Sequence, residues 1–180
     1  MPGYLSSNIF LDTIKMLNTI AEKPLGINDL IFDRTIITHN RTLQYFEYGI
    51  MSLFSSCGFM VMWLDPQNIQ GVDLIVYSSQ FDDIYLIDCT VATIPSVKVS
   101  KIYQTTQRVK KSFPKRSGMI RSIICTNIEE HEIPDIMSIY NKQVGVMYKG
   151  KLNKLYELVD ENRTHKEIAN FIRTYYRNPL

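Results

Sequence analysis

Two aspartates lie inside apolar runs of the sequence. Asp73 interrupts a run of β-branched and aromatic residues at 71–78, and Asp88 interrupts a second such run at 83–91. Both runs are typical of β-strands. A carboxylate in such a run is costly unless a partner or a cation compensates its charge. The two aspartates are therefore the first candidates for a functional site.

The register of a hairpin between these strands decides whether the aspartates meet. If the chain turns around Gln80 and Phe81, paired residues have numbers that sum to 161, and Asp73 faces Asp88. Directly opposed side chains on one face have Cβ atoms about 4.5–5.5 Å apart. Carboxylates that close repel each other, and a divalent cation between them would relieve the repulsion. The hairpin alone leaves a chance coincidence equally open.

The segment after the second aspartate is basic. From 89 to 128 there is no Asp or Glu, whereas Lys and Arg recur. After Pro95, apolar or small residues recur at helical spacing: Val99, Ile102, Thr106, Val109 and Phe113. The opposite stripe consists of cations and amides: Lys98, Lys101, Gln104, Arg108 and Lys111. We therefore predict a helix with one face on the sheet, although such a run is by itself typical of a solvated helix face.

The order of these features resembles the PD-(D/E)XK nuclease superfamily, which has the restriction-endonuclease-like fold. The resemblance covers residues 41–128. It rests on the helical Glu47, on Gly-Val-Asp at 71–73, on Asp-Cys-Thr at 88–90 and on the Lys-bearing helix that follows. It implies metal binding by Asp73, Asp88, Glu47 and the backbone carbonyl of Cys89. It also implies a catalytic set of Glu47, Asp73, Asp88 and Lys98.

The sequence departs from the superfamily pattern at two positions. Val72 stands where the motif has Pro, and Thr90 stands where the motif has Lys. Thr90 points to the same strand face as Asp88 but carries no charge. Some members of the superfamily take the Lys from the following helix. Here Lys98 is the best placed residue for that role, and Lys101 is second.

The function that the resemblance implies is an endonuclease that uses Mg²⁺ or Mn²⁺ to hydrolyse nucleic-acid phosphodiester bonds, with DNA favoured over RNA as the substrate by the general habits of the superfamily. The residues expected to contact nucleic acid are Lys101, Gln104, Arg108, Lys111, Lys115 and Arg116. Two alternatives stay open. One is a non-catalytic nucleic-acid-binding or scaffolding module that keeps the fold, which Thr90 favours. The other is an α/β protein whose two aspartates make ordinary structural contacts.

The remaining patterns predict an α/β fold with a central mixed β-sheet of about four to five strands flanked by helices. We predict a single domain over 1–180, with an N-terminal helical extension at 1–38, a nuclease-like core at 39–150 and C-terminal helices at 151–180. A helix is expected over 40–56. A strand at 59–64, apolar throughout, is expected to be buried on both faces. Further strands are expected at 119–126 and 144–148, and a capping box at 164–167 predicts the start of the last helix.

Composition adds limits on the class of protein. The net charge of +2 over 180 residues is too small to indicate nucleic-acid binding, so the distribution of charge is the signal. The three cysteines have no CxxC spacing, which predicts reduced thiols with no disulfide and no zinc site. No apolar run has the length of a membrane span, and no signal-peptide pattern begins the sequence. We expect an intracellular protein, cytoplasmic or nucleoid-associated, without a membrane partner. A homodimer or larger complex through the terminal helices stays open.

Overall fold

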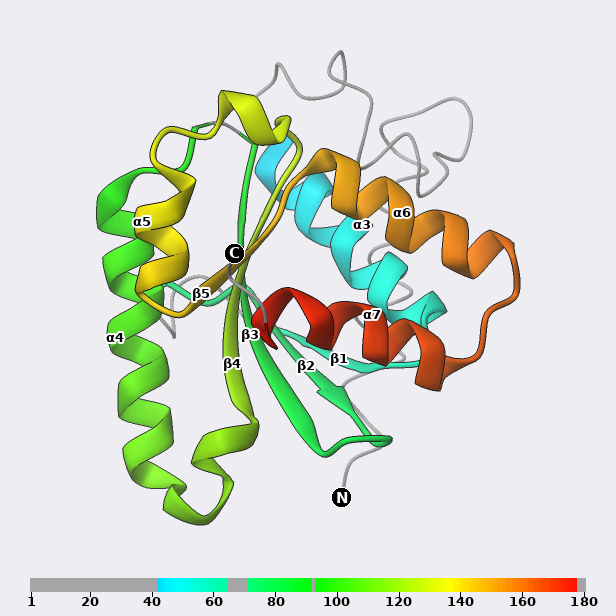
Figure 1. Cartoon of the computed structure of the whole chain (residues 1–180), viewed down its shortest axis with the longest axis horizontal. Coiled ribbons are helices and arrows are strands. Elements are labelled where there is room, and N and C mark those ends of the chain that lie inside the picture. The colour runs from blue at the N-terminus through cyan, green and yellow to red at the C-terminus, as the bar shows by residue number, and fades with distance from the viewer. Residues whose placement is uncertain (1–41, 65–70, 92, 178–180) are drawn as a thin grey trace.

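The structure, a computed structural model, describes residues 42–64, 71–91 and 93–177. The N-terminal extension predicted at 1–38 lies outside these residues. In the described part, a five-stranded mixed sheet has the strand order β1-β2-β3-β4-β5, with helices on both faces (Figure 1). The α/β fold predicted from the sequence is confirmed.

The strands are β1 (Met60–Trp63), β2 (Leu74–Ser78), β3 (Asp83–Thr90), β4 (Ile120–Thr126) and β5 (Val144–Met147). The α-helices are α3 (Thr42–Ser56), α4 (Ser96–Ser112), α5 (Ile136–Asn141), α6 (Lys149–Asp160) and α7 (His165–Arg177). Two short 3₁₀ helices lie at Pro114–Met119 and Glu130–Glu132. Helices α3, α6 and α7 cover one face of the sheet, and α4 and α5 cover the other (Figure 1). The two C-terminal helices are thus part of the layered core.

The β2–β3 hairpin has the predicted register. Leu74 pairs with Ile87 and Ser78 pairs with Asp83, so the paired numbers sum to 161. β1 and β2 are also antiparallel, whereas β3, β4 and β5 run parallel to one another. Helices α4 and α5 connect the parallel strands, as crossover connections must. The carboxyl ends of β3, β4 and β5 therefore meet at one edge of the sheet.

Each face of the sheet has its own apolar cluster. Under α3, α6 and α7 the cluster includes Phe46, Phe54, Tyr85 and Ile87, all fully buried. Under α4 and α5 a second cluster forms around Ile102 and Ile124. Alternation along β3 sends Tyr85 and Ile87 to the first face, and it sends Leu86 and Asp88 to the face that α4 covers. This alternation sets the side of the sheet on which Asp88 lies.

The first strand differs from its prediction. The run at 59–64 was expected to be buried on both faces, but β1 is a four-residue strand paired with β2 at the edge of the described sheet. The side chains of Met60 and Met62 are 66% and 54% exposed. Helix α3 packs on one side of β1 only, and an unbroken apolar run does not reveal how many of its faces a helix will cover. Phe113 also differs: it follows the end of α4 and is exposed rather than part of the inner stripe.

Helix α7 is tied to the sheet at two places. At its start, the ring of His165 is within hydrogen-bond distance of the Cys57 carbonyl (2.7 Å) and the Ser78 hydroxyl (3.2 Å). The predicted capping box is present there, because Thr164 and Glu167 bond each other's backbone N–H groups. Further along, Arg173 pairs with the buried Asp83 at 2.9 Å. These contacts join the last helix to the turn end of the hairpin.

The three cysteines lie inside the fold. Cys57, Cys89 and Cys125 are all buried free thiols. Burial raises the pKa of the Cys57 thiol to about 12, which keeps it protonated at neutral pH. Over the ranges that the structure describes, no helix has both the length and the apolar character needed to cross a membrane.

Candidate metal centre

Asp73 lies immediately before β2, where the backbone is fixed from both sides. Its N–H donates to the Ile87 carbonyl (2.8 Å), and its own carbonyl accepts from the N–H of Leu64 (2.8 Å). The carboxylate Oδ2 accepts from the backbone N–H of Cys89 at 2.6 Å. The numbers 73 and 87 sum to 160, so this bond departs by one residue from the hairpin register, whose pairs end at Leu74 and Ile87. The direct pairing of Asp73 with Asp88 is therefore not seen in the strand ladder, although the Asp73 carboxylate reaches the N–H of the next residue, Cys89.

Gly71 lets helix α4 approach this position. Its φ of +80° belongs to the left-handed region that glycine adopts without strain. A Cβ at Gly71 would stand 3.1 Å from the Cβ of Lys101, closer than ordinary contact. The glycine of the Gly-Val-Asp run thus has a physical role: it lets the second turn of α4 pack beside Asp73.

Asp88 lies near the carboxyl end of β3 and is buried. Its Oδ1 is 2.6 Å from the ammonium of Lys98, which also donates to the backbone carbonyl of Cys89. Lys98 is in the first turn of α4, which begins directly after Pro95, and the burial of Val99 and Ile102 sets the rotation of the helix. The structure therefore brings together Asp73, Asp88, Lys98 and the Cys89 carbonyl.

Glu47 reaches the same region from helix α3 and is 3% exposed. Its Oε2 accepts a hydrogen bond from the indole N–H of Trp63 at 3.1 Å. In the described residues, no three His, Cys, Asp or Glu side chains are arranged to hold a metal ion. That Glu47 shares one ion with Asp73 and Asp88 therefore stays a prediction. The indole N–H of Trp63 engages one of the two carboxylate oxygens of Glu47.

Burial and mutual repulsion make the acids of the site unusually basic. The pKa of Glu47 is raised to about 7, mainly by burial and next by the negative charge of Asp73. The hydrogen bond from Trp63 and the positive charge of Lys98 lower this pKa in part. The pKa of Asp88 is raised to about 6 by burial, with Lys98 opposing the rise and Asp73 adding to it. Carboxyl groups shifted in this way are typical of sites where a charge partner is to be added.

The donor set fits a hard divalent cation. Asp88 Oδ2 is a buried carboxylate oxygen that has no hydrogen-bond partner among the residues that the structure describes, although such atoms are normally satisfied. The Asp73 carboxylate and the Cys89 carbonyl supply further oxygen ligands of the kind that Mg²⁺ and Mn²⁺ prefer. The place between Asp88 and the carbonyl already accommodates a positive group, the ammonium of Lys98. Two carboxylates and a carbonyl could therefore hold an ion.

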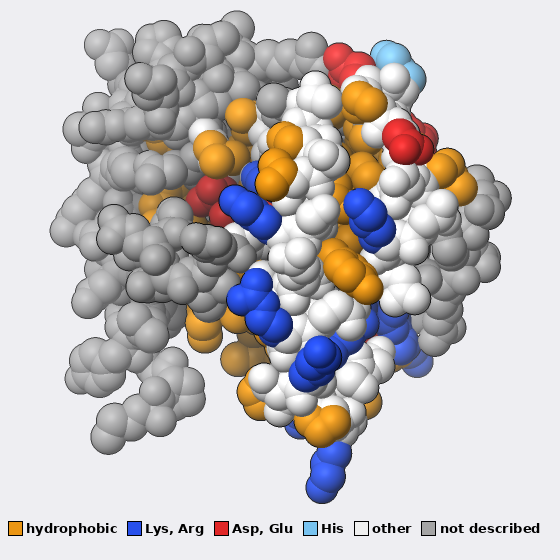
Figure 2. Space-filling view, turned by 90° about the vertical axis from the view of Figure 1, so that its left-hand side faces the viewer, with side chains coloured by type: hydrophobic (Ala, Val, Ile, Leu, Met, Phe, Trp, Pro, Cys, Tyr) orange, Lys and Arg blue, Asp and Glu red, His pale blue; other side chains and the backbone are white. Residues whose placement is uncertain are grey.

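The predicted nucleic-acid contacts line the outer side of α4. Lys101, Gln104, Arg108 and Lys111 are exposed along the helix, and Lys115 and Arg116 are exposed just beyond its end. Figure 2 shows this side: Lys and Arg are spread over it, and the visible Asp and Glu side chains lie near its margins. Arg116 is partly neutralised by Asp82, 3.6 Å away. The other cations offer a basic face that begins beside the candidate metal centre.

Two polar residues near the site were not recognised from the sequence. One is Trp63, for which the signal was available, because a buried indole N–H usually needs an acceptor. The other is Asn127, which is buried and whose Oδ1 has no partner among the described residues. It directly follows Thr126, which pairs with Thr90 across the parallel strands β3 and β4. Asn127 therefore lies at the edge of the sheet where the aspartates gather.

A mixed sheet with this order, flanked by helices on both faces and carrying two aspartates on a central hairpin, has the restriction-endonuclease-like, PD-(D/E)XK fold. The restriction endonuclease FokI is a solved structure with this architecture, with a TM-score of 0.56 and 14% identity. The match covers 91% of this chain and 33% of FokI, so this chain spans about a third of the length of that protein.

Two further restriction endonucleases are more distantly similar. The small subunit of heterodimeric R.BspD6I has a TM-score of 0.42 and 14% identity, with 82% of this chain and 96% of that chain covered. Metal-depleted Ecl18kI in complex with uncleaved, modified DNA has a TM-score of 0.41 and 18% identity, with 99% and 59% covered. No protein-family profile matches the sequence. No curated protein matches it either.

Proposed function

We propose that this chain is a metal-dependent endonuclease that hydrolyses phosphodiester bonds in nucleic acid. The observation that carries the proposal is the convergence of Asp73, Asp88 and Lys98 at one end of the β2–β3 hairpin. DNA is the substrate that we expect, because FokI, which shares the fold, is a restriction endonuclease. We expect Mg²⁺ or Mn²⁺ as the ion, held by Asp73, Asp88 and the Cys89 carbonyl.

Phosphodiester hydrolysis needs a nucleophilic water and compensation for the charge that develops on the phosphate. A divalent ion in such a site lowers the pKa of a water and polarises the phosphate. Lys98 holds its ammonium at the same place, next to Asp88 and the Cys89 carbonyl. From there it can donate hydrogen bonds to the attacking water or to a phosphate oxygen. Glu47 adds negative charge from the side of α3.

The basic face of α4 would hold the substrate. Lys101, Arg108 and Lys111 are exposed along the helix that carries Lys98. Contacts of this kind to backbone phosphates supply affinity and depend on salt, but they do not read sequence. One helix would thus bind the backbone and supply the catalytic cation.

The position of Lys98 is also why we prefer an active enzyme to the non-catalytic module. That alternative rested on Thr90, which replaces the motif Lys of the superfamily. The structure places Lys98 in contact with Asp88, so a cation stands at the site although the strand does not provide one.

The test is cleavage of supercoiled and linear duplex DNA by the purified protein. We expect cutting with Mg²⁺ or Mn²⁺ and none with EDTA, and we expect Asp73→Ala to remove it. The matched control is Asp160→Ala, which alters an exposed acid on α6. A wild-type protein that binds Mn²⁺ but cuts neither DNA nor RNA would refute the enzyme and leave the non-catalytic module.

The raised pKa values predict how metal binding depends on pH. A carboxylate must lose its proton before it binds a cation. Because the pKa of Asp88 is about 6 and that of Glu47 about 7, Mn²⁺ affinity should rise between pH 5 and pH 7.5. Below pH 6 we expect the Kd to weaken by about tenfold per pH unit. Titration calorimetry at constant ionic strength measures this change.

Two variants sharpen the pH experiment. Glu47→Gln should flatten the part of the curve between pH 6.5 and 7.5, because the group with the higher pKa is then gone. Asp160→Asn should leave the whole curve unchanged. A wild-type Kd that is constant from pH 5 to 7.5 would show that these carboxyl groups do not bind the ion.

A further inference from the structure

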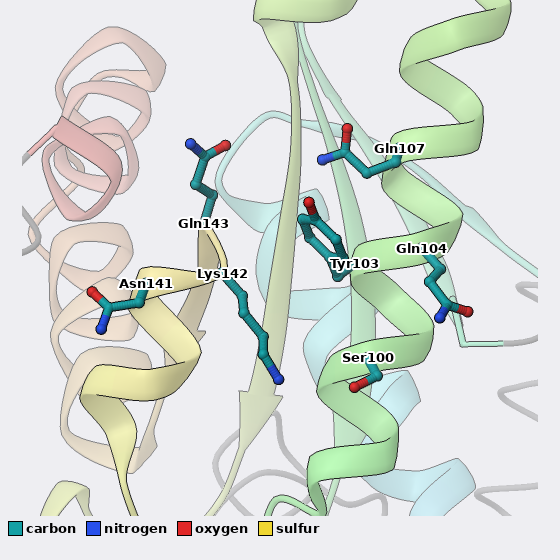
Figure 3. Close-up of a pocket in the computed structure, with 7 residues that line it drawn as sticks. All are labelled: Ser100, Tyr103, Gln104, Gln107, Asn141, Lys142 and Gln143. Atoms are coloured by element: carbon teal, nitrogen blue, oxygen red, sulfur yellow. The ribbon is translucent and has the colours of Figure 1, made fainter.

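A groove of about 510 Å³ lies between α4 and the turn that joins α5 to β5. The residues that line it are Ser100, Tyr103, Gln104, Gln107, Asn141, Lys142 and Gln143. In Figure 3, Tyr103 and Gln107 project from α4 toward the space between the two elements, and Lys142 extends toward α4 from the end of α5. None of the described residues that line this groove is aliphatic or acidic. Its chemistry is that of amides, hydroxyl groups and one ammonium.

The buried face of α4 holds one wall of the groove in place, and three side chains that line the groove have no hydrogen-bond partner among the described residues. On α4 the burial of Val99, Ile102 and Thr106 determines which way the outer residues face. Within the described residues, Tyr103, Gln107 and Lys142 make no side-chain hydrogen bond or ion pair with one another or with any other residue. An amide offers two donors and an acceptor, so Gln107 presents a full hydrogen-bonding set to whatever enters.

We propose that this groove is a sequence-reading subsite for duplex DNA, in which Gln107 and Tyr103 contact the edges of bases. The proposal rests on the nuclease function proposed above and goes beyond it by assigning specificity to a place. A Gln or Asn side chain can pair with adenine through two hydrogen bonds in the major groove of DNA, which the phosphate contacts of α4 cannot replace.

The geometry of α4 relates the groove residues to Lys98 in the candidate metal centre. At 1.5 Å per residue, Tyr103 and Gln107 lie about 7.5 and 13.5 Å along the axis from Lys98. The nine residues from Lys98 to Gln107 also make about two and a half turns, so these two side chains leave α4 on opposite sides. The bases that the groove reads are therefore expected across the helix from the phosphate that is cut.

Charge favours DNA over a second copy of the chain as the occupant. The exposed cations Lys101, Arg108 and Lys111 share α4 with the groove, and Lys142 lies across from them. In a symmetric dimer the same patch faces itself, so these cations would repel their counterparts. A stable dimer also needs an apolar centre, and among the lining residues only Tyr103 offers apolar area. A polyanion such as DNA is attracted by these cations and needs no apolar centre in order to bind.

The test is selection of bound duplexes from a random-sequence DNA pool in Ca²⁺, followed by sequencing. We expect wild-type protein to enrich particular bases by about tenfold or more. Gln107→Ala should lose the enrichment at one position while its affinity for the unselected pool changes less than about twofold. Tyr103→Ala should lose it at a neighbouring position. Gln80→Ala is the matched control, because Gln80 is an exposed amide at the hairpin turn, and it should behave as wild type.

Several results would overturn the proposal. The first is that wild-type protein enriches no bases. The second is that both alanine variants enrich the same bases as wild type to the same extent. The third is that duplex RNA competes for the protein as well as duplex DNA does. A change of oligomeric state in Gln107→Ala or Tyr103→Ala by light scattering would assign the groove to a second copy. If the protein enriches bases but does not cut DNA in Mg²⁺, the nuclease proposal is refuted and the groove proposal stands. If the protein cuts DNA at random sites and the alanine variants bind DNA as wild type does, the groove proposal is refuted and the nuclease proposal stands.

Discussion

Replacing Asp88 with asparagine is expected to reduce metal-dependent cleavage to background while the protein stays folded. The change keeps the size of a buried side chain and removes the negative charge that faces Lys98 and lies beside Asp73. An amide oxygen is a much weaker ligand for a hard cation than a carboxylate. Mn²⁺ binding by calorimetry should be lost together with cleavage.

The fold itself should tolerate this change, and the sign follows from the pKa. Asp88 has a pKa raised from 3.8 to about 6, so its ionised form is disfavoured in the folded protein. That cost is absent below pH 3.8, grows as the pH rises to 6 and is complete above it. At pH 8, Asp88→Asn should therefore melt at the same temperature as the metal-free wild type or higher. A clear fall in melting temperature would mean that lost cleavage reflects misfolding, and cleavage at the wild-type rate would refute the role of Asp88.

Replacing Lys98 with alanine is expected to lower turnover by about a hundred- to a thousandfold. Unlike the aspartate change, it should preserve metal binding. The Lys98 ammonium now interacts with Asp88 and the Cys89 carbonyl, so its removal frees oxygen atoms for the ion. The Kd for Mn²⁺ should stay the same or tighten. Single-turnover cleavage with saturating DNA measures the chemical step without the contribution of binding.

A second substitution tests whether the position of the cation matters, rather than its presence on α4. Thr90 lies on the same strand face as Asp88, two residues along β3. Thr90→Lys in the Lys98→Ala background should restore part of the lost activity. Lys101→Ala is the control from the same helix: it should weaken DNA binding and reduce its salt dependence without a large loss of turnover. Full activity of Lys98→Ala would refute the catalytic role of this lysine.

The hairpin and its aspartates were predictable because their determinants are local. β-branched runs on either side of a short turn define a register, and alternation then assigns Asp88 to one face. The position of Lys98 was also predictable, since Pro95 precedes a helix start and the stripe through Val99 orients the first turn.

The rest depends on contacts between distant segments. The helices that lie over β1 decide whether it is buried on both faces. The apolar composition of the strand does not predict which of its faces they cover. The hydrogen bond between Trp63 and Glu47 joins β1 to α3, and the groove beside Gln107 exists only because the α5–β5 turn lies next to α4. Such proximity is a property of the whole topology, so an apolar or amide pattern within one element does not reveal it.

The attachment of α7 has a consequence for protein synthesis. A ribosome makes the chain from its N-terminus, so the hairpin with both aspartates is made long before His165 and Arg173. Until those residues emerge, Asp83 lacks the guanidinium of Arg173, and Ser78 and the Cys57 carbonyl lack the imidazole. A nascent chain that stalls before α7 thus lacks one of the three helices that cover this face of its sheet. We expect the turn end of the hairpin to be held in place only when translation has passed α7.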